Sequence, residues 1–185
     1  MPQIITVYHG ANALVQNPEI RPVSRPMDFG TGFYATTLIT QAAEWARKKS
    51  IKEGGTPIVS VYNLNMGNIE SERSIKSFAG TSDDWIDFIL KHRKASAYNA
   101  VSVDISGKSR RRLVAKKGIH HEFDLVMGEV ADDDVFDAIT LYEVNVITYD
   151  ELKRRLRTKR ENDQLCFCIP ASLTYLEFVG QYVTP

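Results

Sequence analysis

Short extended segments alternate with amphipathic helical segments at irregular intervals along this chain, and this order constrains its fold most. Residues 4–9 and 58–64 alternate apolar and polar side chains, which is typical of half-buried strands. Residues 40–51 and 83–92 instead place apolar side chains on one helical face. Because the helices are too irregularly spaced for repeated βαβ units, the sequence predicts an α+β fold with a mixed or mostly antiparallel sheet.

The second half of the chain continues this mixture. A capping box at Thr148 introduces one helix, and Pro170 in a first turn introduces another at the carboxyl end. The expected elements are strands at 100–105, 123–130 and 164–169, and helices at 132–138, 148–158 and 170–178.

The length and charge of the chain limit the classes of protein to which it can belong. Its 185 residues fit a single domain, and no linker, repeat or low-complexity tract divides them, so we expect one domain over residues 1–185. Basic and acidic residues number 23 each, which leaves no global field to attract nucleic acid or a membrane surface. Without a signal segment or a membrane-length apolar run, we expect a cytoplasmic protein with no membrane partner.

The two cysteines do not indicate a disulfide or a metal site. Cys166 and Cys168 are separated by one residue, so at strand spacing both thiols point to one face, where small buried thiols are common. Asp132-Asp133-Asp134 stands at a helix start, where acids compensate the helix dipole. No ordered ligand set accompanies either group, and the sequence predicts no metal.

His9 and Gln164 are candidates for polar contacts with a small ligand. His9 ends a strand just before Gly10, which brings a ring nitrogen and a bare backbone close to any neighbouring cleft. Gln164 begins a later strand on the face of the small thiols, where an amide could donate to and accept from a ligand hydroxyl. The alternatives are a satisfied core or strand-end histidine and a polar strand start or cap.

The segment 28–34 could form the floor of such a cleft. If it is extended, Gly30, Gly32 and Tyr34 lie on one face and give a bare surface with an aromatic ring at its end. The alternative is a β-bulge or a corner strand with Tyr34 in the core. The segment is not a phosphate loop, because it lacks the lysine and the helix-opening glycine pattern.

Together these segments resemble a bacterial domain family of uncharacterised function that is grouped with the ADP-ribosyltransferases. The resemblance covers nearly the whole chain and implies a split sheet with flanking helices around an NAD cleft. It rests on Tyr8-His9-Gly10, Gly32-Phe33-Tyr34-Ala35-Thr36 with residues 41–46, residues 123–133, and Gln164-Leu165-Cys166-Phe167.

Similarity to the histidine-tyrosine-glutamate branch of that superfamily implies roles for individual residues. His9 would hydrogen-bond the adenosine ribose of NAD, Gly10 would hold the nicotinamide carboxamide through its backbone, and Tyr34 would stack on the nicotinamide ring. Gln164 would occupy the position of the catalytic glutamate. The catalytic residues are then His9, Tyr34 and Gln164, and the cofactor-binding set is His9, Gly10, Gly32, Phe33, Tyr34 and Thr36.

Gln164 departs from the pattern of that branch. A carboxylate at this position grips a ribose hydroxyl and stabilises an oxocarbenium-like transition state, a role that a neutral amide fulfils less well. Gln164 can still orient the hydroxyl, and we consider Glu161 or Asp163 as the source of the missing charge. The resemblance also implies that Glu161, Asn162 and Asp163 lie on the loop that selects the acceptor.

The resemblance therefore implies a mono-ADP-ribosyltransferase that uses NAD and modifies a protein or nucleic-acid acceptor. Small bacterial members look like toxins of toxin–antitoxin pairs or phage-defence modules, which would make a small antitoxin a partner. The rival hypothesis, favoured by the missing carboxylate, is a catalytically silent NAD-binding or protein-interaction module. A third hypothesis, nucleic-acid binding through the basic stretch 108–117, also stays open.

Overall fold

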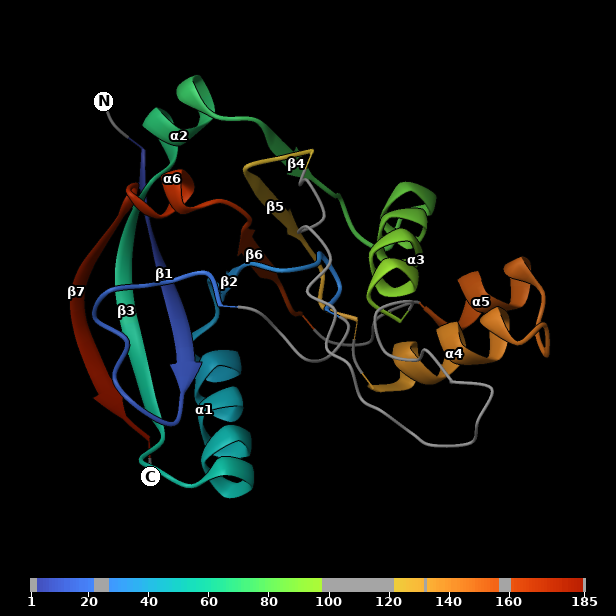
Figure 1. Ribbon diagram of the computed structural model, residues 1–185, viewed down its shortest axis with the longest axis horizontal. Helices are drawn as coiled ribbons and strands as arrows, with labels where there is room; N and C mark the ends of the chain where they lie inside the picture. The colour runs from blue at the N-terminus through green and yellow to red at the C-terminus, as the bar shows by residue number, and fades with distance from the viewer. Residues whose placement is uncertain (1–2, 22–26, 98–121, 132, 157–160, 185) are drawn as a thin grey trace, which may run out of the picture.

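Two β-sheets that meet at one point form the framework of the structure (Figure 1). The computed structural model describes residues 3–21, 27–97, 122–131, 133–156 and 161–184. In chain order its elements are β1 (Ile4–Ala11), β2 (Phe33–Ala35), α1 (Ile39–Glu53), β3 (Ile58–Asn65), α2 (Met66–Glu72), β4 (Ile75–Ser77), α3 (Asp83–Ala97), β5 (Leu125–Gly128), α4 (Asp133–Glu143), α5 (Tyr149–Arg155), β6 (Gln164–Phe167), α6 (Pro170–Leu173) and β7 (Leu176–Val183).

The two sheets differ in strand direction. The first sheet has the order β1-β3-β7 and is antiparallel throughout. The second has the order β2-β6-β5-β4, in which β4 and β5 run parallel and the other pairs run antiparallel. The predicted α+β class with mixed and antiparallel sheets and flanking helices is thereby confirmed.

The sheets are joined where β1 meets the end of β2. Tyr8 N donates to Thr36 O at 2.7 Å, and Thr36 N donates to Tyr8 O at 2.9 Å. β1 and β2 are edge strands of their own sheets, so this pair of hydrogen bonds connects one sheet to the other.

The two faces of the second sheet belong to different cores. In β6, Leu165 and Phe167 point into a core shared with β1 and β3 of the first sheet, where Val7 and Leu64 are buried. This alternation along β6 is the one that the sequence predicts. It leaves the opposite face of the sheet for a second core under the helices.

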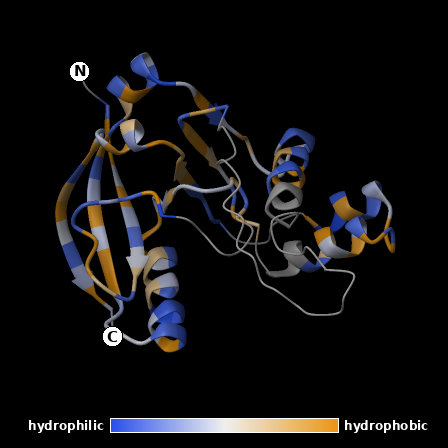
Figure 2. Ribbon diagram, viewed as in Figure 1, coloured by the Kyte–Doolittle hydropathy of each residue, from blue (hydrophilic) through white to orange (hydrophobic). Residues whose placement is uncertain are grey.

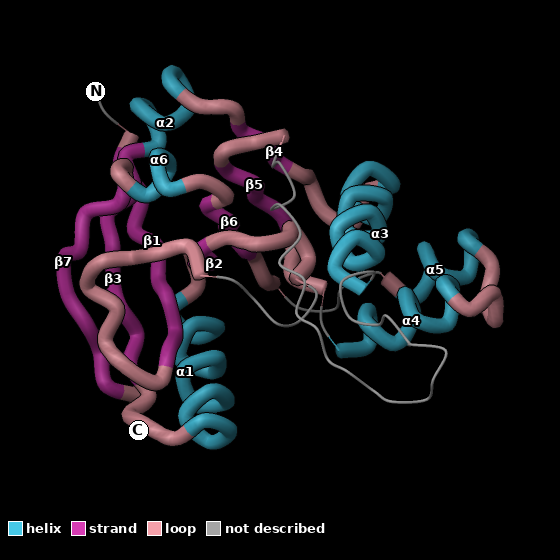
Figure 3. Tube along the Cα trace, viewed as in Figure 1, coloured by secondary structure: helices cyan, strands magenta, loops and turns pink. Residues whose placement is uncertain are grey.

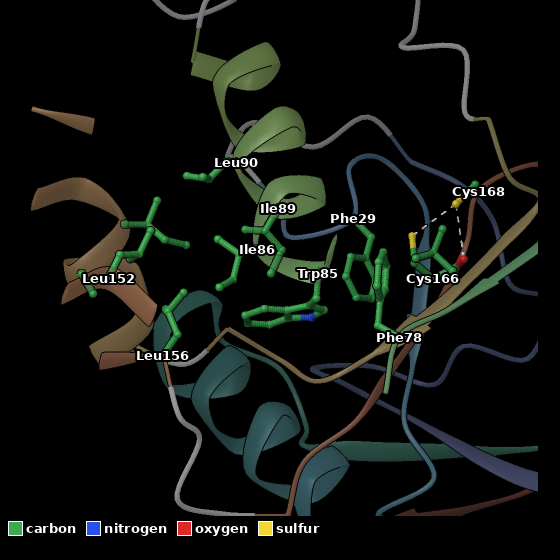
Figure 4. Packing of buried hydrophobic residues seen from close by; sticks show 13 residues of the cluster. Phe29, Phe78, Trp85, Ile86, Ile89, Leu90, Leu152, Leu156, Cys166 and Cys168 are labelled. Atoms are coloured by element: carbon green, nitrogen blue, oxygen red, sulfur yellow. Dashed lines mark hydrogen bonds between the residues drawn. The ribbon is translucent and has the colours of Figure 1, made fainter. Parts of the chain in front are cut away.

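The second core fills the space between that opposite face and helices α3 to α5 (Figure 4). Trp85 of α3 is completely buried at its centre, beside Phe29, and Leu152 of α5 is buried on the far side. Cys166 and Cys168 lie at its sheet side, where both thiols are buried as predicted and are not joined by a disulfide. Burial raises the pKa of the Cys166 thiol, which keeps it protonated and unreactive.

Helix α1 covers the first sheet through small side chains. Ala42 and Ala46 pack on Val59 of β3. The sequence also predicts Trp45 in this apolar stripe, but its side chain is 40% exposed, and Lys48 lies over its ring at 5.8 Å. The alternation of apolar and polar residues along β1, β3 and β7 is visible as colour bands in Figure 2.

The carboxyl end differs most from the prediction. The helix predicted over residues 170–178 is only the short α6, and β7 follows it (Figure 3). Leu176 and Phe178 pack into the core between the sheets from β7, because β3 offers an unpaired edge that this segment fills. Helix α2 and strand β4 were not predicted. The strand predicted at 100–105 lies outside the described residues.

Among the described residues, none of the helices combines the length and the apolar character that crossing a bilayer requires.

Candidate functional site

The joined sheets bring His9 and Tyr34 into direct contact. The Nδ1 atom of His9 lies 2.6 Å from the backbone oxygen of Tyr34. A carbonyl oxygen only accepts hydrogen bonds, so Nδ1 carries the ring proton and Nε2 keeps its lone pair. The imidazole also stacks on Phe33, with ring centroids 4.5 Å apart. His9 is therefore held in one orientation and one tautomer.

The surroundings of His9 keep its ring neutral. The pKa of His9 is lowered to about 4, chiefly by burial; the hydrogen bond to Tyr34 opposes this shift, and the nearby charge of Lys49 adds to it. The ring is consequently uncharged at neutral pH, and Nε2 can serve as a hydrogen-bond acceptor.

The phenol of Tyr34 closes the turn that precedes β2. Its oxygen donates to Gly30 O at 2.7 Å and accepts from Phe29 N at 3.2 Å. Burial is the main reason why the pKa of Tyr34 stands well above its usual value. The ring is partly buried against the core under the helices, which agrees with the alternative in which Tyr34 belongs to a corner strand.

The extended, bare floor expected at residues 28–34 is not present. Only Phe33–Ala35 form a strand, and Gly30 has a φ of 84°, at the end of a turn closed by Gly30 N donating to Met27 O at 3.2 Å. Gly32 has no side chain because β6 lies against it: a Cβ there would overlap Cys166 Sγ and would lie 2.8 Å from Phe167 O. The glycines thus serve a tight turn and a close strand approach.

Gly10 is bare for a similar reason. A Cβ at this position would overlap the backbone oxygen of Ala42 and would lie 2.9 Å from Ala46 N. Helix α1 therefore occupies the space where a side chain would stand, and only the remaining backbone surface of Gly10 is open to its predicted role in holding a carboxamide.

Gln164 is buried and held by its amide nitrogen. Nε2 donates to Asp28 Oδ2 at 3.0 Å and to Glu129 O at 2.9 Å. Both partners are acceptors, which identifies the nitrogen and uses both of its protons. Gln164 lies two residues before Cys166, the cross-strand neighbour of Tyr34, so Tyr34 and Gln164 share one face of the sheet.

Asp28 is the site residue that sequence reasoning missed. Its carboxylate is buried and accepts from Ala131 N at 2.9 Å as well as from Gln164. The sequence places Asp28 at the start of the glycine-containing segment, but no local pattern signals that the turn at 27–30 directs it toward β6. Its partner is 136 residues away.

The carboxylate of Asp163 is bonded just before α1. Its carboxylate accepts from the hydroxyls of Thr36 and Thr37 and, at 2.9 Å, from Thr37 N. Its backbone oxygen accepts from Gln41 Nε2 at 2.6 Å. Asp163 thus holds the turn that leads into α1, and Thr36 is buried within this cluster.

The other two residues of the predicted acceptor loop, Asn162 and Glu161, have different surroundings. Asn162 Oδ1 accepts from Val130 N at 2.8 Å, which ties this loop to the end of β5. Glu161 is exposed. Neither of these residues, nor Asp163, has a hydrogen bond to Gln164 in the described part of the chain, where Asp28 is the carboxylate that bonds the amide.

Two surface hollows lie elsewhere. One, of about 440 Å³, is lined by residues that include Asn65, Arg73 and Tyr175. The other, of about 680 Å³, includes Pro18 and Phe178. His9, Tyr34 and Gln164 line neither of them, so the NAD cleft stays a prediction. The basic stretch 108–117 lies outside the described residues.

Comparison with known proteins places the chain in a family. It belongs to the family described as "Protein of unknown function (DUF3990)", whose pattern matches residues 5–178. The match spans all the candidate site residues, but the family description names no activity. No curated protein and no solved structure matches the chain.

Proposed function

We propose that this protein binds NAD where its two sheets meet and transfers ADP-ribose to a protein or nucleic-acid acceptor. One observation supports this most: strands from three distant parts of the chain bring His9, Tyr34 and Gln164 to the junction of the sheets. The resemblance of these residues to the histidine-tyrosine-glutamate pattern supports ADP-ribosyl transfer as the reaction.

In this proposal His9 recognises a hydroxyl of the adenosine ribose. Its Nε2 atom is an acceptor because Nδ1 is bound to Tyr34 O, and the low pKa of His9, about 4, keeps the ring neutral over the physiological range. A neutral acceptor fixed by stacking on Phe33 suits a hydroxyl donor.

Tyr34 would offer its ring to the nicotinamide. The two hydrogen bonds of its hydroxyl fix the ring before any ligand arrives, so stacking would cost little conformational entropy. Gly10 would contribute backbone groups, and Gly32, Phe33 and Thr36 would shape the site around them.

Gln164 would orient the ribose next to the scissile bond. Both of its amide protons are used by Asp28 and Glu129, which leaves the Oε1 atom to accept from a ribose hydroxyl. Cleavage then releases nicotinamide, and the ADP-ribosyl group passes to the acceptor. A toxin or phage-defence role, with a small antitoxin as partner, would suit this activity.

The second candidate function is an NAD-binding or protein-interaction module without turnover. The observation that favours it is the neutral amide at position 164, where a carboxylate would stabilise positive charge better.

Calorimetry with NAD and a nicotinamide-release assay separate the two functions. The transferase should bind NAD, release nicotinamide and pass label from labelled NAD into protein, RNA or DNA of a cell lysate. Gln164→Ala should abolish release, whereas Gln181→Ala, at an exposed position of β7, should not. NAD binding without release would support the silent module, and undiminished transfer by Gln164→Ala would exclude the proposed role of Gln164.

A further inference from the structure

We propose that Asp28 replaces the missing glutamate charge by acting through Gln164, so that the two residues work as one pair. This inference rests on the proposed function and deepens it. It makes Asp28 a positioning residue and Gln164 the group that touches the substrate.

The geometry of the pair carries the inference. Gln164 Nε2 lies 3.0 Å from Asp28 Oδ2, and both side chains are more than nine-tenths buried. The same carboxylate oxygen is fixed by Ala131 N at 2.9 Å, and the second amide proton is fixed by Glu129 O at 2.9 Å. Neither member can rotate without leaving a buried polar group unpaired, which would be costly.

A carboxylate that accepts from an amide N–H changes the charge on the amide oxygen. The negative charge draws the N–H proton toward itself and shifts amide electron density toward the carbonyl end, so Oε1 becomes a stronger acceptor. This effect is larger in a buried site than in water, because the local dielectric is low. Gln164 Oε1 thereby gains part of the negative character that a glutamate would supply.

The predicted acceptor loop has two carboxylates, of which Glu161 is exposed and Asp163 is bonded elsewhere. Asp163 is bound to the hydroxyls of Thr36 and Thr37 at the start of α1. Within the described ranges, Asp28 is the carboxylate that contacts Gln164 and is buried with it.

The chemical step that the pair assists is cleavage of the bond between the nicotinamide nitrogen and C1′ of its ribose. The bonding electron pair leaves with the nicotinamide, which departs neutral, and positive charge remains on the ribosyl carbon and ring oxygen. Oε1 holds the 2′-hydroxyl and opposes this positive charge. A nucleophile of the acceptor then bonds to C1′ and releases its proton to water.

Asp28→Asn is the direct test, because it removes the charge and keeps the size and an acceptor oxygen. We expect its kcat for nicotinamide release to fall by about tenfold or more, with KM for NAD changed by less than about threefold. Asp124→Asn is the matched control. Asp124 accepts from Ser74 N at 3.3 Å at the far end of β5, so its loss should leave both constants unchanged.

Exchanging the carboxylate at position 28 and the amide at position 164 separates the effect of the charge on kcat from an effect of misfolding. In Asp28→Asn/Gln164→Glu the amide nitrogen introduced at position 28 can donate to the carboxylate at position 164, although Ala131 N and Glu129 O lose the partners that the wild type gives them. We expect this double variant to have a higher kcat than Asp28→Asn, because the charge is restored. A folded Asp28→Asn with wild-type kcat would overturn the inference, and so would a folded double variant no more active than Asp28→Asn, with folding checked by circular dichroism and thermal melting.

The wild-type protein distinguishes this failure from failure of the proposed function. If wild type binds and cleaves NAD while Asp28→Asn does so equally well, only the role of Asp28 is wrong. If wild type neither binds NAD in calorimetry nor releases nicotinamide, the proposed function is wrong and this inference falls with it.

Discussion

Tyr8 and Thr36 exchange two backbone hydrogen bonds, of 2.7 and 2.9 Å, that tie the edge of the three-stranded sheet to the edge of the four-stranded sheet. His9 follows Tyr8, and Tyr34 precedes Thr36 by two residues, so this junction also sets the contact between the imidazole and the backbone of Tyr34. The candidate site is therefore part of the connection between the sheets.

The neutral state of His9 should make stability depend on pH. Its pKa is about 4 in the folded protein and about 6.5 in an unfolded chain. Above pH 6.5 the ring is neutral in both states. As the pH falls from 6.5 to 4 the unfolded state takes up a proton first, so the free energy of unfolding should fall, by up to about 3 kcal/mol.

Urea unfolding between pH 4 and 8 measures this effect, with His9→Gln as the reference. The glutamine amide can still donate to Tyr34 O but does not titrate, so the two pH profiles should diverge below pH 6.5. Parallel profiles for the two proteins would show that His9 is not buried in the neutral form.

Two substitutions of Tyr34 separate its contribution to stability from its contribution to nicotinamide binding. Tyr34→Phe leaves Phe29 N and Gly30 O without their phenol partner, and we expect it to lose about 1–3 kcal/mol of stability. Because the ring remains, nicotinamide release by the folded variant should persist. Tyr34→Ala should lose both this stability and nicotinamide release. The measurements are thermal melting and nicotinamide release, and a stable but inactive Tyr34→Phe would place the hydroxyl itself in the chemistry.

Gly10→Ala should be strongly destabilising. The added methyl group would overlap the backbone oxygen of Ala42, and a helix backbone cannot move away as a flexible side chain can. We expect a loss of roughly 3 kcal/mol or more in chemical unfolding. Gly180→Ala is the control, because a Cβ there meets no atom within 4 Å. Similar stability of the two variants would argue against the close packing of α1 on β1.

Asp163→Ala should loosen the start of α1. The change removes the acceptor of the Thr36 and Thr37 hydroxyls and of Thr37 N, so we expect a loss of about 2 kcal/mol. The exposed Asp137 of α4 provides the comparison, since Asp137→Ala should change stability by less than about 0.5 kcal/mol. Equal unfolding midpoints would show that the contacts of Asp163 contribute nothing.

Gln164→Glu alone should be less stable than the wild type. It would bring a second carboxylate to a buried position 3.0 Å from Asp28 Oδ2, and two like charges at that distance cannot both stay ionised without a large cost. Adding Asp28→Asn should restore part of the stability, because it removes the repulsion, while Ala131 N and Glu129 O still lack their wild-type partners. A double-mutant cycle of unfolding free energies measures this coupling, and additive effects would mean that the two side chains do not interact.

Local patterns predicted much of the fold. Alternation of apolar and polar residues is a short-range property, and it located β1, β3 and β6 as well as the opposite faces of Leu165 and Cys166. The Thr148 cap was also predictable, and its hydroxyl accepts from Glu151 N at 3.3 Å. β7 was missed because its pairing with β3 depends on an edge that no local pattern reveals.

Local sequence patterns were enough to predict the α+β class, the faces of the long strands, and His9, Tyr34 and Gln164 as candidate residues. The folded chain was needed to see that Gly10 and Gly32 lack side chains because neighbouring elements pack against them, and that Asp28 bonds Gln164 across 136 residues of chain. Periodicity shows only how a residue faces within its own helix or strand. A turn at Gly30 and the pairing of distant strands decide which residues meet.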